Sequence, residues 1–321
     1  MRNIARNHHY VPQFYLKGFS DPNLQNEQLH VIDKGERRHF VTTAPNIAVQ
    51  RDFNRINIPG HSMDEIERQL AQIEGKVATV LRSIAENATL PEDDADMDYL
   101  IVFVAILAAN NPQIRERLIN RDREISRQMM QSLVTSREVY ESRLSDLGME
   151  DRIGYEAARA FVESENYTIN VEDPFGYYLA VVFNGLYETV LPVFSTMDWS
   201  LVIAEEGETD FVCSDLPAVL FKVVNLIPHL QLPYTITSAG LILPNKATQI
   251  NNTTESLELT MPLNPRMAIY ATTFPTGYRM SPAYINKRTI DASTRHIYCS
   301  NLDFKFCDNE VMKSGWNLVD V

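Results

Sequence analysis

The densest group of chemically active side chains lies near the start of the chain. His8 and His9 are adjacent, and Pro12 follows them in a short apolar segment that ends at Phe19. Imidazole is the commonest acid–base group at neutral pH and a common metal ligand. Neighbouring side chains on an extended strand point to opposite faces, so one histidine would face a site while the other orients it or binds a partner. The alternative is that both are ordinary hydrogen-bonding histidines.

Three acidic residues further along the chain are candidate partners for the histidines. Glu67 and Glu74 are seven residues apart, so a helix would place them on one face, two turns and about 10 Å apart. Asp52 precedes them in a segment expected to be extended as far as Ile58. We expect a divalent metal ion to be held by ligands drawn from His8, Asp52, Glu67 and Glu74. The alternative for the two glutamates is a solvated helix face.

A fourth acidic residue, Asp215, lies in the sequence Ser214-Asp215-Leu216-Pro217 at the end of a predicted strand. Aspartate before a proline turn often caps backbone amides. In the functional alternative, Asp215 approaches the N-terminal histidines, fixes their tautomer and raises their basicity. The candidate catalytic residues are therefore His8, His9 and Asp215, with His9 as the general base.

The elements that position these side chains can be predicted from the apolar pattern. Ser62-Met63-Asp64-Glu65 has the form of a capping box at the start of an amphipathic helix of about 25 residues. A second helix, Ala95 to Ala109, is apolar nearly all round and must be central, and Asn110-Asn111-Pro112 breaks or kinks it. The helix beyond Pro112 is polar and mostly exposed. A further helix is expected from Asp173-Pro174 to Leu191.

Strands are predicted mainly in the first and last parts of the chain. Each predicted pair consists of two β-branched or aromatic runs around a short turn. The pairs are Leu29–Ile32 with His39–Thr42, Trp199–Ile203 with Phe211–Cys213 around Glu205–Glu208, and Leu257–Leu263 with Met267–Ala271. The segment Tyr284–Tyr298 is predicted to be a helix.

These elements predict an α+β fold, with a long-helix core, an antiparallel strand block and an irregular N-terminal segment packed on it. We expect one domain over residues 1–321. Its sub-regions are the histidine segment 1–60, the helical region 62–195 and the mixed strand and helix region 198–321.

Composition narrows the class of protein. The net charge of −13 disfavours nucleic acid and anionic membranes as partners, except through a local basic patch. Residues 1–60 supply a weak patch of this kind, through which nucleic acid is the expected partner. The alternative is a solvated surface of mixed charge. Three unpaired cysteines, the absence of an apolar signal core and a longest apolar run of eleven residues, Tyr99–Ala109, predict a cytoplasmic protein with no membrane partner.

The stretch His8–Phe19, HHYVPQFYLKGF, resembles the opening signature of a bacterial family of domains of unknown function, number 4238. Further stretches fit that family's pattern in order: Asn46–Ala48 with Asp52-Phe53, Ile66-Glu67 with Ile73-Glu74, Phe211–Pro217, Met261–Leu263, and Asn286 with Arg295. From these stretches we select Gln13, Asn46, Asn286 and Arg295 as candidate substrate-binding residues. The chain departs from the pattern at Leu216, at Asn110-Asn111 and at Leu107. The resemblance implies no established reaction.

The shorter sequence His-His-x-Val-Pro is similar to the start of the active site of HNH-type nucleases. That resemblance implies that one histidine activates water while its neighbour helps to hold a divalent metal. The second half of the motif has no clean counterpart, because His30 and His39 fall inside predicted strands. The leading hypothesis is a metal-dependent phosphodiesterase or nuclease that acts as a toxin or defence effector. The rival is a non-catalytic binding or regulatory module whose histidines are structural.

Overall fold

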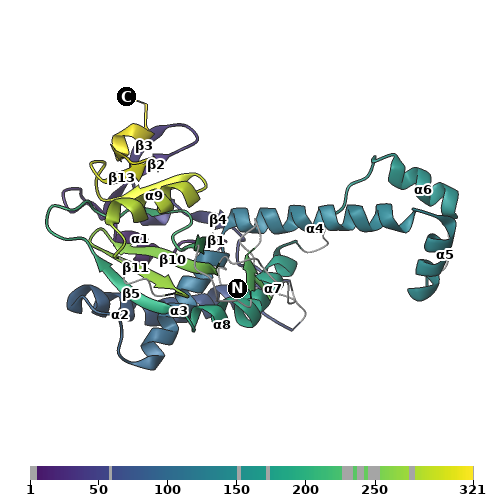
Figure 1. Ribbon diagram of the computed structural model, residues 1–321, viewed down its shortest axis with the longest axis horizontal. Helices are drawn as coiled ribbons and strands as arrows, with labels where there is room; N and C mark the ends of the chain where they lie inside the picture. The colour runs from purple at the N-terminus through teal and green to yellow at the C-terminus, as the bar shows by residue number, and fades with distance from the viewer. Residues whose placement is uncertain are drawn as a thin grey trace.

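Two four-stranded antiparallel sheets lie at the centre of the described part of the molecule, and one long helix projects from it (Figure 1). The computed structural model describes residues 6–57, 60–149, 153–170, 174–225, 234–236, 242–244, 254–274 and 279–320. Long helices fill the middle of the chain, and antiparallel strands lie on either side of them. The fold is therefore α+β, as the sequence predicts.

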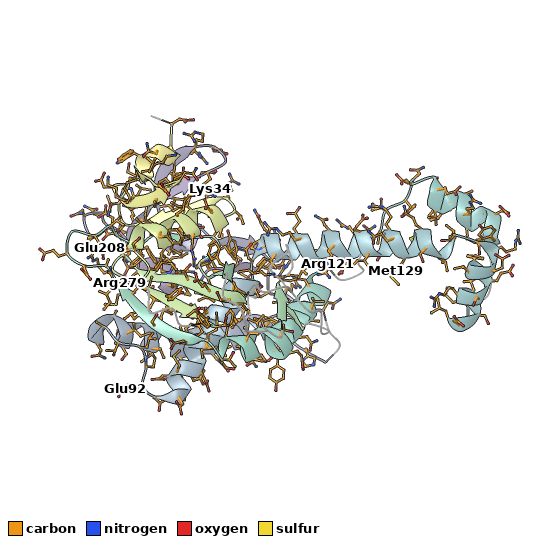
Figure 2. All side chains as sticks on the ribbon, viewed as in Figure 1. Lys34, Glu92, Arg121, Met129, Glu208 and Arg279 are labelled. Carbon is orange, nitrogen blue, oxygen red and sulfur yellow. The ribbon has the colours of Figure 1, made fainter. Side chains whose placement is uncertain are left out.

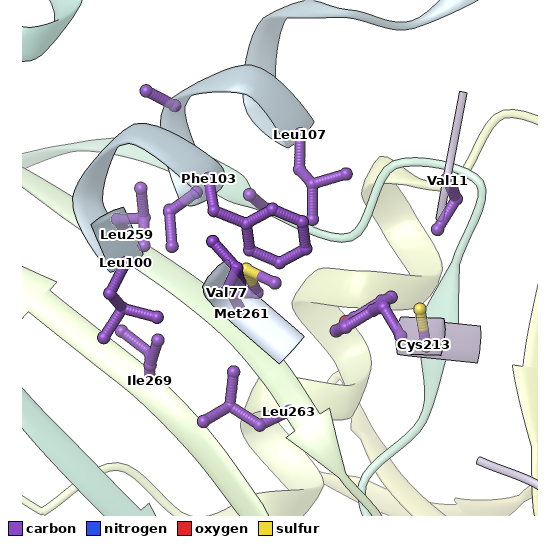
Figure 3. Close-up of a cluster of buried hydrophobic side chains, with 14 of the residues drawn as sticks. Val11, Val77, Leu100, Phe103, Leu107, Cys213, Leu259, Met261, Leu263 and Ile269 are labelled. Carbon is purple, nitrogen blue, oxygen red and sulfur yellow. The ribbon is translucent and has the colours of Figure 1, made fainter. Parts of the chain in front are cut away.

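The first sheet has the strand order β5 (Asp198–Ile203), β11 (Met267–Thr272), β10 (Thr254–Asn264) and β7 (Val219–Asn225). The predicted pairing around Asn264-Pro265 is confirmed as β10 with β11. Helices α2 (Glu65–Asn87) and α3 (Asp94–Ala109) contribute Val77, Leu100 and Phe103 to one core with Leu259 and Ile269 of this sheet (Figure 3). Helix α3 is apolar on all sides because it is enclosed by this core.

The second sheet has the order β3 (Arg38–Thr43), β2 (Gln28–Asp33), β12 (His296–Cys299) and β6 (Cys213–Ser214). The predicted β2–β3 hairpin is confirmed. Helix α9 (Pro282–Ala292), the hairpin of β13 (Lys305–Asp308) with β14 (Val311–Ser314), and a 3₁₀ turn at Gly315–Leu318 complete this part of the chain. A further strand pair joins β8 (Tyr234–Ile236) to β9 (Ile242–Pro244).

The N-terminal segment is built into the core rather than laid over it. Strand β1 (Asn7–His9) pairs with β4 (Val49–Arg51), a 3₁₀ turn at Ala44–Asn46 precedes β4, and helix α1 (Gln13–Lys17) follows Pro12. Val11, Leu16 and Phe19 are fully buried in the same core as α2 and α3. Glycine is needed at position 18, where a Cβ would lie 3.3 Å from the Leu263 carbonyl oxygen.

Helices α4 (Pro112–Leu133), α5 (Arg137–Asp146) and α6 (Tyr155–Glu163) form an arm that extends from the body (Figure 1). The predicted break at Asn110–Pro112 is confirmed: Asn111 caps α4 by accepting from the Gln113 N–H at 2.8 Å, and α3 and α4 meet at a bend of 58°. Helix α7 (Pro174–Gly185) then continues through a π-helical turn, Leu186–Val190, into α8 (Leu191–Phe194). Asp173, predicted to begin this helix, lies outside the described residues.

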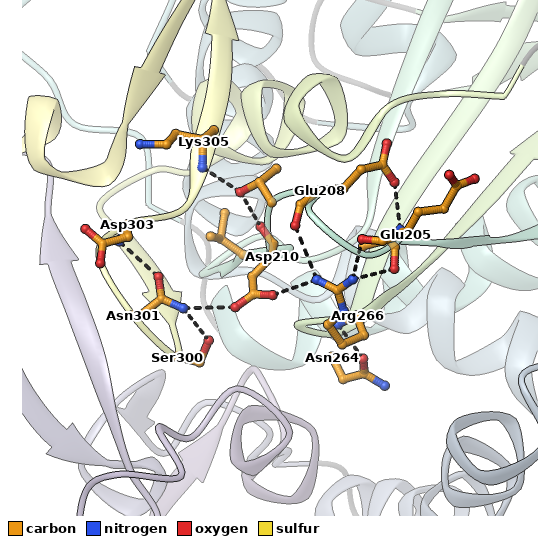
Figure 4. A network of polar contacts seen from close by, with 12 residues as sticks. Glu205, Glu208, Asp210, Asn264, Arg266, Ser300, Asn301, Asp303 and Lys305 are labelled. Carbon is orange, nitrogen blue, oxygen red and sulfur yellow. Dashed lines mark hydrogen bonds and ion pairs between the residues drawn. The ribbon is translucent and has the colours of Figure 1, made fainter.

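The predicted hairpin around Glu205–Glu208 is wrong. A turn is present, with the Glu208 N–H donating to the Glu205 carbonyl at 3.0 Å, but β5 pairs with β11 and β6 pairs with β12 in the other sheet. Arg266 holds this crossing by donating to the carbonyl oxygens of Ala204 and Glu205 and to the Asp210 carboxylate (Figure 4).

The predicted helix Tyr284–Tyr298 is also wrong in its second half. Helix α9 ends at Ala292, and β12 begins at His296 because the Asp215 carboxylate draws the intervening N–H groups of Thr294 and Arg295 into a turn. Strand β12 is then paired on both sides, with β2 and β6.

Two local predictions around α2 fail as well. The capping box does not form, since α2 begins at Glu65 behind Asp64, and the Ser62 hydroxyl donates to the Asp64 carboxylate instead of accepting from the backbone. Asp52 begins a turn and not an extended segment: its φ is +57°, and its carbonyl accepts from the Arg55 N–H at 3.1 Å. Ile58, the predicted end of that segment, lies outside the described residues.

No one helix in the described ranges has the length and apolar character to cross a bilayer, although the bent pair α3 and α4 meets that test when the two are taken together. Cys213 and Cys299 are buried thiols and Cys307 is half-buried.

Candidate functional site

The pairing of β1 with β4 sends the two histidines in opposite directions. His8 lies opposite Gln50 and His9 opposite Val49, and the extended backbone alternates their side chains. His8 is 2% exposed, whereas His9 is half-buried at the edge of a cavity. The predicted division of the pair into an inner and an outer histidine is confirmed.

His8 is held by a polar cluster that reaches α2 and the end of α3. Its Nδ1 accepts the Asn54 backbone N–H at 2.8 Å, which requires the proton of the neutral ring to be on Nε2. The fully buried Asn54 side chain donates from Nδ2 to the Glu67 carboxylate at 2.8 Å and accepts from the Asn110 amide at 3.4 Å. Asn54 therefore links His8, Glu67 and Asn110.

His9 faces a cavity of about 20 Å³ between the N-terminal segment and the two core helices. The cavity is lined by Glu74 of α2, by Asn110 and by apolar side chains of α2 and α3. Its volume suits one water molecule, and its polar walls could hold that water. Gln13 lies beside His9, with 3.3 Å between the Gln13 amide nitrogen and His9 Nδ1, and so orients the ring.

Two of the ionisable groups that line the cavity, Glu74 and His9, have pKa values displaced in opposite directions. Burial, reinforced by the negative charge of Glu67, raises the pKa of Glu74 to about 7. Burial lowers the pKa of His9 despite the opposing effects of the Pro45 backbone and Glu67. At neutral pH a neutral imidazole thus shares a cavity with a carboxyl group that is close to half-protonated. This is the relation found between acid–base partners in hydrolytic sites.

Asp52, a predicted metal ligand, lies among arginines. Its carboxylate accepts from Arg6 Nε at 3.1 Å and from Arg55 Nη1 at 3.3 Å, and Arg51 Nε lies 3.6 Å away. The hydrogen bond from Arg6 and the charges of Arg6 and Arg55 lower the pKa of Asp52 to about 2. Three arginines around one carboxylate leave a surplus of positive charge beside β1.

The four predicted metal ligands do not form one coordination sphere. His8 and Glu67 bind opposite ends of Asn54, Glu74 lines the cavity, and Asp52 pairs with arginines. Among the residues that the structure describes, no group of three or more His, Cys, Asp or Glu side chains is arranged to hold a metal ion. These residues therefore do not fit a ready-made metal centre.

Asp215 caps a turn, as one of the two sequence alternatives predicts. Its carboxylate accepts the backbone N–H groups of Thr294 at 2.8 Å, Arg295 at 2.7 Å and His296 at 3.2 Å, and also the Thr294 hydroxyl. These bonds occupy both carboxylate oxygens, which gives Asp215 a structural role at the start of β12.

The remaining predicted substrate-binding residues lie apart from the cavity. Asn46 is exposed and donates to the hydroxyl groups of Thr42 and Thr43. Asn286 is fully buried and bonds only backbone groups near β6 and β13. Arg295 donates to the buried Asp33 carboxylate at 2.9 Å. Of this set, Gln13 alone lies beside the histidine pair.

Comparison with known proteins gives the chain a family. Residues 7–301 match the family described as "Protein of unknown function (DUF4238)". The chain belongs to this family. The match begins at the strand that carries the two histidines and extends over both sheets, so the resemblance read from the histidine motif is confirmed. No curated protein and no solved structure matches this DUF4238 chain significantly.

The asparagines at which this DUF4238 protein departs from the expected family pattern have defined contacts. Asn110 binds Asn54 and lines the cavity, and Asn111 donates to the Asp215 carbonyl at 2.5 Å. They join the end of α3 to the histidine cluster and to β6.

Sequence reasoning missed Asn54 and Arg115. The Arg115 guanidinium lies 3.8 Å from the Phe53 ring centre and 4.3 Å from that of Tyr178, and donates to the Phe53 carbonyl at 2.7 Å. Burial lowers the pKa of Arg115 to about 10. Arg115 thereby fixes the turn that presents Asn54 to His8. The sequence did contain one signal for Arg115: it lies in the first turn of a polar helix, directly after the break at Asn110–Pro112.

Proposed function

We propose that this protein is a hydrolase of phosphate esters, a phosphodiesterase or nuclease, in which His9 and Glu74 exchange protons with a water molecule between them. The observation that supports the proposal is the cavity itself. It is large enough for one water, and its lining includes both His9 and Glu74, whose pKa is raised to about 7.

In the proposed reaction, His9 takes a proton from the water as the water oxygen attacks phosphorus. The bond between phosphorus and the leaving oxygen breaks, and the protonated form of Glu74 gives its proton to that leaving oxygen. Gln13 orients the His9 ring, and the cluster of His8, Asn54 and Glu67 holds the strand in place. Such acid–base pairs contribute about 10²–10⁴ in rate.

The substrate class is supported by the arginines beside the histidine strand. Arg6, Arg51 and Arg55 surround Asp52, and Arg6 is three residues from His9, about 10 Å along an extended chain. On a protein of net charge −13, this is a local surface that attracts a phosphate. Nucleic acid as partner, a divalent metal as cofactor and a cytoplasmic location stay predictions.

The proposal is tested with a chromogenic phosphodiester and with single- and double-stranded nucleic acid as substrates. His9→Ala and Glu74→Gln should each lower the rate by about 10²–10⁴. His61→Ala and Glu86→Gln are matched controls, since both residues are exposed and Glu86 lies on the same helix as Glu74. Activity that survives both cavity variants would refute the assignment. Titration with EDTA and with Mg²⁺ tests the metal dependence separately.

The rival function is a binding or regulatory module, and one observation favours it. His8, the more buried histidine, is engaged in fixing a backbone turn, which is a structural role. This function predicts that the folded protein cleaves none of these substrates but binds nucleic acid or phosphate. It also predicts that Arg55→Glu abolishes that binding. Both results together would identify a non-catalytic binding module.

A further inference from the structure

The arm, defined as α4, α5 and α6, is a projecting structure with little support from its own chain. Its shaft, α4, has 22 residues and is therefore about 33 Å long. Arg115, in its first turn, is the sole buried residue that α4 contributes. Besides Arg115, α4 contacts the body through the half-buried Leu118 and through α7, and it meets α5 and α6 at its other end. Much of the surface between these contacts is exposed.

The tip of the arm, defined as α5 and α6 with the end of α4, has a small core of its own. Val134, Tyr140, Tyr155, Ala158 and Val162 are its buried residues. Around this core the surface is unusually apolar. Of the sixteen large hydrophobic side chains exposed within the described residues, seven lie in the arm or in the connection between α5 and α6: Ile125, Met129, Val139, Leu147, Met149, Ile153 and Phe161.

The exposed fractions in the arm are large. Met129 on the shaft is 67% exposed, and Leu147 beyond α5 is 68% exposed. Figure 2 shows Met129 projecting from the side of α4, well away from the body. A second protein surface packed against the arm would bury both side chains, as apolar side chains at the centre of an interface are buried.

Charge indicates which partner fits the arm. Apart from the buried Arg115, residues 112–133 contain four arginines and three acidic residues, and residues 137–163 contain four arginines and seven acidic residues. The shaft is thus net positive and the tip net negative. The negative charge of the tip repels nucleic acid and anionic lipid. When a second arm runs antiparallel to the first, however, the negative tip of each arm lies beside the positive shaft of the other and attracts it.

We propose that the arm is a dimerisation element, and that two copies of this chain pair their arms antiparallel so that each acidic tip packs against the other copy's basic shaft. A two-fold axis through the shafts makes such a contact self-complementary and closed. An open hollow of about 380 Å³ at the tip, between the end of α4 and α6, receives side chains of the partner. The proposal is independent of the hydrolase.

The test is the mass of the full-length protein in solution, measured by sedimentation over a wide range of concentrations. A dimer of twice 36.7 kDa is expected for the wild-type chain. Met129→Asp should weaken dimerisation at least about tenfold, because both copies lose an apolar contact. Met312→Asp is the matched control, as Met312 is 59% exposed but lies on β14 of the body.

Two charge reversals test the orientation of the arms. Arg121→Glu in the shaft and Glu141→Arg in the tip should each weaken the dimer, and so should added salt. Glu92→Arg, on the body, should have no effect (Figure 2). A wild-type protein that is monomeric at every concentration, or a dimer insensitive to Met129→Asp, would overturn the proposal. So would a monomer that binds duplex DNA through Arg121.

Discussion

Replacement of Glu74 by glutamine should make the protein more stable, and increasingly so as the pH rises. The folded state holds the pKa of Glu74 at about 7, against an ordinary value of 4.5, because the charged form is buried near Glu67. Below pH 4.5 the carboxyl group is protonated in both the folded and the unfolded chain, and the folded state carries no penalty. Between pH 4.5 and 7 the unfolded chain releases its proton first, so stability is lost as the pH rises.

The full displacement corresponds to about 3 kcal/mol, and partial contact of Glu74 with solvent reduces this to about 2 kcal/mol. Glutamine has nearly the same shape and no charge. Urea unfolding at several pH values should therefore show equal stability for wild type and Glu74→Gln near pH 4.5, and a variant about 2 kcal/mol more stable at pH 8. Glu86→Gln, exposed on the same helix, should track the wild type throughout. If Glu74→Gln raises the free energy of unfolding by the same amount at every pH, then ionisation of Glu74 is not what destabilises the folded protein.

Four further substitutions are predicted from packing and hydrogen bonding, each measured by urea unfolding. His8→Ala leaves the buried Asn54 N–H without its imidazole acceptor and should cost about 1–3 kcal/mol, and a neutral result would contradict the role given to His8. Asn286→Ala removes three hydrogen bonds to backbone groups and should lower the free energy of unfolding by about 2–4 kcal/mol. A loss close to zero, as expected for an alanine substitution at an exposed asparagine, would contradict this structural role. Gly315→Ala would bring a Cβ within 2.7 Å of the Leu302 carbonyl oxygen and should cost about 1–3 kcal/mol. Gly75→Ala, which meets no atom within 4 Å on α2, should stabilise the protein by up to about 1 kcal/mol.

The sequence was a good guide at most places where the signal was local, although the local capping-box signal at Ser62 failed. The apolar run from Ala95 to Ala109 predicted an enclosed helix, and the Asn-Asn-Pro sequence predicted its end, because proline in the first turn and an asparagine cap act within a few residues. The alternation of His8 and His9 followed from strand geometry alone.

The failures arise where a distant contact decides the structure. The turn near Glu205 was recognised, but Arg266, some sixty residues later, decides that the chain crosses to another sheet. Helix α9 ends where Asp215 captures the backbone of Thr294, a contact across 79 residues. Asn54 gave no local signal at all, since its importance comes from three distant contacts: its backbone N–H donates to His8, and its side chain binds Glu67 and Asn110.

The pH–rate profile of phosphodiester cleavage by the wild-type protein and by Glu74→Gln tests the proposed function most directly. For the wild-type protein, the cleavage rate should fall as the pH rises through about 7, where Glu74 loses its proton. For Glu74→Gln, the rate should be lower by a factor of about 10²–10⁴ and should no longer fall in that pH range. A variant that cleaves at the wild-type rate with an unchanged profile would contradict the proposed function.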